Sequence, residues 1–98
     1  MNGLIVNRIS EEEILSAYEK GYEKIIFYSP KGGLYLNDER HFKIKEITYA
    51  KAREFSKKGF IDIEPRTILA AERCSLEIEI KGQRDERPTI IRGYVSHS

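Results

Sequence analysis

The stretch Pro30-Lys31-Gly32-Gly33 has the residue types of a phosphate-binding loop, since a lysine and two glycines follow an apolar run. A Walker-type loop places the lysine after its last glycine, adds Ser or Thr, and leads directly into a helix. Here the lysine comes first, and Leu34-Tyr35-Leu36 continues as a strand. Proline followed by glycine is typical of a tight turn. We therefore predict a hairpin turn, with Lys31 as an additional phosphate contact only.

The other reactive side chains are two histidines, His41 and His97, and a single cysteine, Cys74. Nucleophilic catalysis requires Ser, Cys or Thr beside a base that a third group orients. His97 is next to last, and His41 shares a predicted strand face with Lys43, which favours a solvated histidine. Cys74 alternates with apolar residues and is best explained as a core side chain. We therefore predict a non-enzymatic protein with no catalytic residues, no bound metal and no cofactor.

Positive charge is concentrated in one part of the chain. Residues 40–58 hold seven Lys or Arg against two Glu, although the net charge of all 98 residues is only +1. A positive surface of this kind neutralises phosphates and binds nucleic acid in a salt-dependent way. The side chains assigned to this surface are Arg40, His41, Lys43, Lys45, Lys51, Arg53, Lys57 and Lys58.

Nucleic-acid binding through this block is the primary functional hypothesis, with Lys31, Arg84 and Arg87 as further contacts from two loops. The alternative is a solvated helix face in a charge-rich protein. No zinc finger, RNP or KH signature identifies a particular nucleic-acid module. The nature of the nucleic acid is left open.

Two helices must position the cations of the block. Ser10 followed by three glutamates is a capping signal, and the helix is expected over 10–20, before Gly21. The second helix is expected over 48–58, with Thr48 as N-cap and Gly59 after its last turn.

Strands are expected wherever β-branched residues cluster or alternate, namely at 4–6, 24–28, 34–36, 41–45, 74–81 and 89–95, with a short extended piece at 60–63. Residues 68–73 fit either a helical turn or a bulged strand. In a strand Glu72 would fall on the apolar face, whereas a short helix would turn it outward. The predicted fold is a small single α+β domain over 1–98, with a mainly antiparallel sheet, two helices and a C-terminal β-hairpin.

The last strand supports a rival hypothesis from another class of function. It is apolar on both faces and carries one charge, so as an edge strand it would pair with another chain. The protein would then be a homodimer, or a virus- or plasmid-type factor that binds a host protein. The interface residues would be Ile90, Ile91, Arg92, Tyr94 and Val95.

Composition restricts the remaining possibilities. With 40% hydrophobic and 34% charged residues the chain is globular, and one cysteine excludes an internal disulfide. Abundant charge of both signs resembles the composition of hyperthermophile proteins. No apolar run is long enough to span a membrane, and the N-terminal residues do not resemble a secretory signal. A cytoplasmic protein without a membrane partner is therefore expected.

Overall fold

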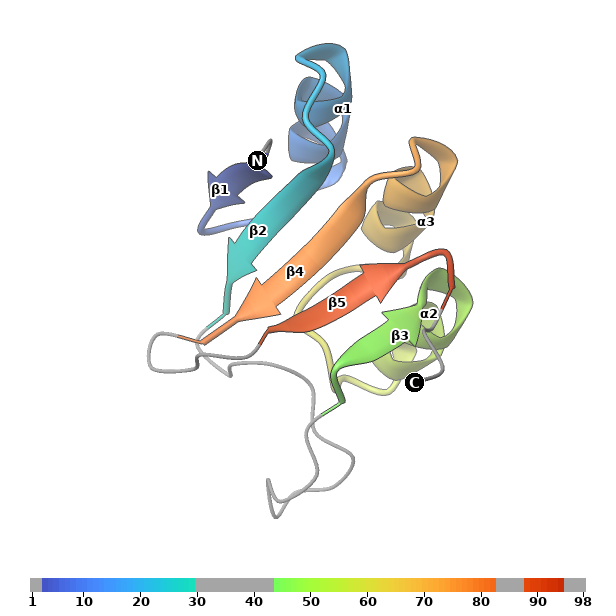
Figure 1. Ribbon diagram of the computed structural model, residues 1–98. Coiled ribbons are helices and arrows are strands. Elements are labelled where there is room, and N and C mark those ends of the chain that lie inside the picture. The colour runs from blue at the N-terminus through green and yellow to red at the C-terminus, as the bar shows by residue number, and fades with distance from the viewer. Residues whose placement is uncertain (1–2, 30–43, 83–87, 95–98) are drawn as a thin grey trace.

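The computed structural model describes residues 3–29, 44–82 and 88–94. These residues form five strands in one sheet and three helices packed behind it (Figure 1). The elements in chain order are β1 (Gly3–Val6), α1 (Glu11–Glu19), β2 (Lys24–Tyr28), β3 (Glu46–Thr48), α2 (Tyr49–Lys57), α3 (Pro65–Arg73), β4 (Glu77–Lys81) and β5 (Thr89–Arg92).

Local signals place α1 and α2, and both predicted positions are confirmed. Ser10 is the N-cap of α1, although its hydroxyl bonds to the Glu13 carboxylate and not to a backbone amide. The Thr48 hydroxyl accepts from the Lys51 amide at 3.2 Å, which satisfies a free donor at the start of α2. Gly59 has a φ of +83° just after α2, a conformation that glycine adopts without steric cost.

The third helix, α3, corrects the prediction of only two helices. Pro65 occupies its first turn, where a missing amide hydrogen costs nothing. Thr67, Ile68 and Ala71 are buried on one side of this helix, a spacing that a strand cannot produce. Glu72 therefore points outward and pairs with Arg53, as the helical alternative required.

The predicted antiparallel sheet is wrong. The strand order is β1-β2-β4-β5-β3, and the pairs β1–β2, β2–β4 and β3–β5 are parallel. Only β4 and β5 are antiparallel neighbours. The crossover from β1 to β2 contains α1, which is the usual connection between parallel strands. Residues 34–36 and 41–43 of the predicted strands lie outside the described residues, and residues 44 and 45 precede β3.

The expectation that the last strand is a sheet edge is also wrong, because β5 lies between β4 and β3. Ile91 is fully buried. Arg92 is bonded within the chain, through Nη1 to Glu46 at 2.7 Å and through Nη2 to Glu77 at 3.0 Å. A partner strand therefore cannot add to β5 without displacing a neighbour. Tyr94 is exposed, and Val95 lies outside the described residues.

The core lies between the sheet and the helices. Alternate strand residues face the helices and are almost completely buried, including Ile25, Phe27, Ile78, Ile80 and Ile91. On the helical side they meet Ile14, Ala17, Ala52, Ile68 and Ala71. Within the described part of the chain, no helix is long and apolar enough to cross a membrane.

Candidate functional site

A hollow of about 470 Å³ opens where the parallel strands β1 and β2 end. In open sheets with parallel strands, ligands bind beyond the carboxyl ends of the strands. The hollow is lined by Asn7, Arg8, Ile9, Ser10, Glu13, Phe27 and Asp62. Its position in the fold and its polar lining make it the best candidate site among the described residues.

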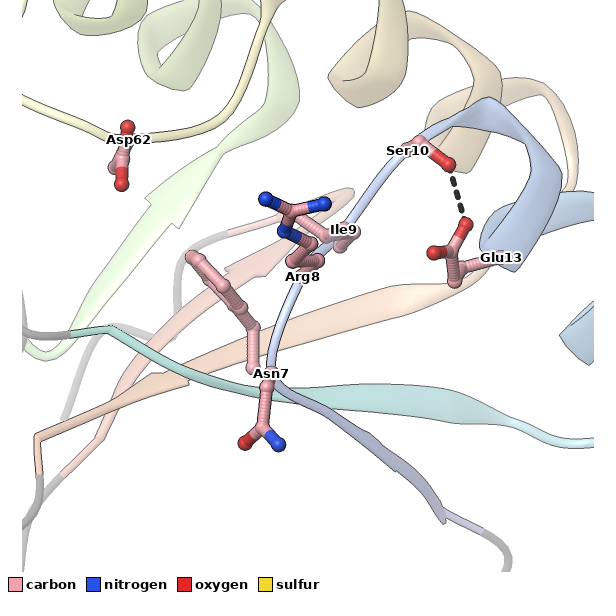
Figure 2. Close-up of a pocket in the computed structure, with 7 residues that line it drawn as sticks. Asn7, Arg8, Ile9, Ser10, Glu13 and Asp62 are labelled. Carbon is pink, nitrogen blue, oxygen red and sulfur yellow. Dashed lines mark hydrogen bonds between the residues drawn. The ribbon is translucent and has the colours of Figure 1, made fainter.

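Three elements hold these side chains in place. The linker from β1 to α1 supplies Arg8, and Phe27 of β2, which is 3% exposed, adds a buried ring to the lining. Across the hollow, Asp62 comes from the segment between α2 and α3 (Figure 2). That segment is anchored by Ile61 and Ile63, whose side chains are buried on either side of Asp62 in sequence.

The lining combines both signs of charge. Arg8 contributes a planar cation, which suits a carboxylate or a phosphate. Asp62 and Glu13 contribute acids, and the Glu13 carboxylate is already bonded to the Ser10 hydroxyl (Figure 2). Arg8 and Asp62 are exposed, so both are accessible to a ligand from solvent. The arrangement therefore suits a small molecule that carries separate positive and negative groups.

In the described part of the predicted basic block, two of the five cations take part in ion pairs within the chain. Lys51 pairs with Glu54 at 3.1 Å, and Arg53 pairs with Glu72 of α3. Lys45, Lys57 and Lys58 are exposed. The remaining predicted contacts lie outside the described residues; they are Arg40, His41, Lys43, Lys31, Arg84 and Arg87.

The sequence interpretation missed Arg8 and Asp62. A signal for Arg8 was present, because the apolar run Leu4-Ile5-Val6 is followed directly by polar residues and a capped helix. That succession is typical of a ligand-binding linker after a parallel strand. Asp62 carried no such signal, because its segment was interpreted as a short extended piece, and only tertiary packing brings it to the hollow.

No family model matches the chain, and no curated protein matches it. Solved structures do. Aspartokinase III from E. coli, in complex with lysine and aspartate, aligns with a TM-score of 0.73 at 22% identity over 89% of this chain. Aspartate kinase from Synechocystis aligns with a TM-score of 0.72 at 15% identity over 90% of this chain. UMP kinase from Bacillus anthracis aligns with a TM-score of 0.64 at 14% identity over 86% of this chain.

These similarities establish the fold, which this chain shares with a portion of small-molecule kinases. The chain spans only 21%, 16% and 40% of those three chains, respectively. The matched proteins are named for an amino acid or a nucleotide. Together with the ion pairs of Lys51 and Arg53, this finding overturns the hypothesis of a nucleic-acid-binding surface.

Proposed function

We propose that this chain is a small-molecule-binding domain that holds an amino-acid-like zwitterion in the hollow beyond β1 and β2. The observation that carries the proposal is the opposed charge of Arg8 and Asp62 across that hollow. Arg8 would bind the carboxylate of the ligand, and Asp62 and Glu13 would attract its ammonium group. The fold supports this ligand class, since one matched structure was solved with lysine and aspartate.

Nucleotide binding is the second candidate. E. coli aspartokinase III was also solved with aspartate and ADP, and it aligns with a TM-score of 0.71 over 86% of this chain. The charge of the lining argues against a nucleotide in this hollow, because one cation is present beside two acids. Phosphate groups would be repelled there unless a divalent cation accompanied them. Binding of ADP that requires Mg²⁺ would therefore favour this second candidate.

We propose binding without phosphoryl transfer. The chain corresponds to a fifth of E. coli aspartokinase III and two fifths of the UMP kinase. Among the described residues, no group of three or more His, Cys, Asp or Glu is placed to hold a metal ion. It remains a prediction that the chain is not an enzyme and that it has no resident cofactor.

Calorimetric titration with lysine, aspartate, ADP and UMP, each with and without Mg²⁺, tests the proposal. We expect saturable binding of an amino acid and at least roughly tenfold weaker binding in Arg8→Gln, which removes the cation but keeps much of the side chain. Arg66→Gln is the matched control, because Arg66 is an exposed arginine outside the hollow. Binding of no amino acid, or equal binding by both variants, would contradict the proposal.

A further inference from the structure

In the described part of the chain, no helix covers the face of the sheet opposite α1, α2 and α3, which we call the open face (Figure 1). All three helices of the described chain lie on one side of the sheet (Figure 1). Sheets built from parallel strands are normally covered on both faces. Here three of the four strand pairings are parallel. Most strand residues that point away from the helices retain partial exposure, and the exception is Glu79, which is 8% exposed.

Three isoleucines and one glutamate form a row across this open face. Ile5 of β1 is paired in register with Ile26 of β2, Ile26 with Glu79 of β4, and Glu79 with Ile90 of β5. Ile5 is 62% exposed, and Ile26 and Ile90 are partly exposed. Three isoleucines in one row give a monomer no benefit on a face in contact with water, whereas they would contribute to a covered interface.

The charges on the open face are balanced, and five of the six take part in ion pairs within the chain. Its strands carry three cations and three acids, which are Lys24, Lys81, Arg92, Glu46, Glu77 and Glu79. Lys24 Nζ lies 2.7 Å from Glu79 Oε1, and Arg92 bridges Glu46 and Glu77. The side chains of Lys24, Glu79, Arg92 and Glu46 are only 11–20% exposed. An interface on this face would therefore add little desolvation free energy for these side chains, because they are already largely buried and paired within one copy.

We infer that the open face binds a second copy of this chain, sheet against sheet. A face with no net charge does not repel a copy of itself, and its internal ion pairs leave little to attract a strongly charged partner. A two-fold arrangement would place the isoleucine row of one copy against that of the other, as in stacked sheets about 10 Å apart. This inference does not depend on the ligand of the hollow.

The test measures molar mass by light scattering over a roughly hundredfold range of concentration. We expect a dimer that dissociates on dilution. In Ile5→Lys and Ile26→Lys, the dissociation constant should rise by at least roughly tenfold, since each change buries an unpaired charge twice in the interface. Ile5 is well exposed, so its replacement should leave the fold intact, which circular dichroism checks.

Leu15→Lys is the matched control. Leu15 is 51% exposed on α1, on the helical side of the sheet, and its replacement should leave the dimer intact. A wild-type chain that stays monomeric throughout the range would overturn the inference. So would a dimer that Leu15→Lys dissociates and Ile5→Lys does not, because the helices would then form the interface.

Discussion

Tyr49 provides a sharp test of the packing between α2 and the sheet. Its side chain is 5% exposed, and its hydroxyl donates to the carbonyl of Leu76 just before β4. Burial raises the pKa of Tyr49 to about 12, and the carboxylates of Glu77 and Glu72 act in the same direction, whereas Arg92 opposes them. The phenol therefore stays protonated in the folded chain at pH values where an exposed tyrosine has ionised.

This raised pKa makes the stability fall in alkali. An unfolded tyrosine ionises near pH 10, whereas folded Tyr49 ionises near 12. Its contribution to stability is fully present below pH 10 and is lost as the pH rises toward 12. Because one pKa unit corresponds to about 1.4 kcal/mol, roughly 1.4 kcal/mol should be lost by pH 11, approaching about 2.7 kcal/mol above pH 12.

Tyr49→Phe separates this effect from other alkaline titrations. At pH 8 the variant should be about 1–2 kcal/mol less stable than the wild type, because the buried Leu76 carbonyl loses its donor. At pH 11 that difference should shrink by about 1.4 kcal/mol, because only the wild type has a phenol to ionise at this position.

The assay is urea denaturation of both proteins at pH 8 and pH 11, followed by circular dichroism. Tyr18→Phe is the control, since Tyr18 is 58% exposed and its removal should change stability equally little at both pH values. If the difference between wild type and Tyr49→Phe is the same at pH 8 and pH 11, the raised pKa is wrong.

Three further predictions concern single elements and use the same urea denaturation. Thr48→Ala should destabilise the fold by about 1 kcal/mol, because it removes the acceptor of the Lys51 amide, whereas Thr48→Ser should be nearly neutral. Ser75→Gly should stabilise it by about 0.5–1 kcal/mol, since Ser75 has a φ of 55° after α3; a loss of stability would contradict this. Arg92→Met should destabilise by about 2 kcal/mol through the loss of charged hydrogen bonds, and by less when Glu46→Gln is already present, because then mainly the bond to Glu77 is lost; additive effects would refute the coupling.

The sequence by itself determined where α1 and α2 begin and end, because the signals at their ends are local. Capping residues and left-handed glycines act over four or five residues, so their effects can be recognised without tertiary structure. Ser10 and Thr48 therefore start the predicted helices, and Gly21 and Gly59 follow them with positive φ. The β-branched runs likewise identified β1, β2, β4 and β5 as strands.

The sequence did not decide between helix and strand for α3, because the residues at its start fit both. Pro65 can end an extended segment or begin a helix, and both interpretations keep Glu64 extended, as it is in the structure. The alternation predicted from Cys74 onward also crosses Ser75, so it does not show where the helix ends and the strand begins. Burial of Ile68 and Ala71 against the sheet selects the helix, and that packing is not a local property.

The direction and order of the strands were decided by tertiary structure alone. A parallel and an antiparallel strand have the same residue preferences, and the neighbours of a strand depend on contacts far apart in sequence. The two isoleucines of β5 show this, because Ile91 is buried on the helical side whereas Ile90 lies partly exposed on the opposite face of a strand between β4 and β3. The candidate site could not be predicted for the same reason, since Arg8 and Asp62 are 54 residues apart in sequence and line one hollow only in the folded chain.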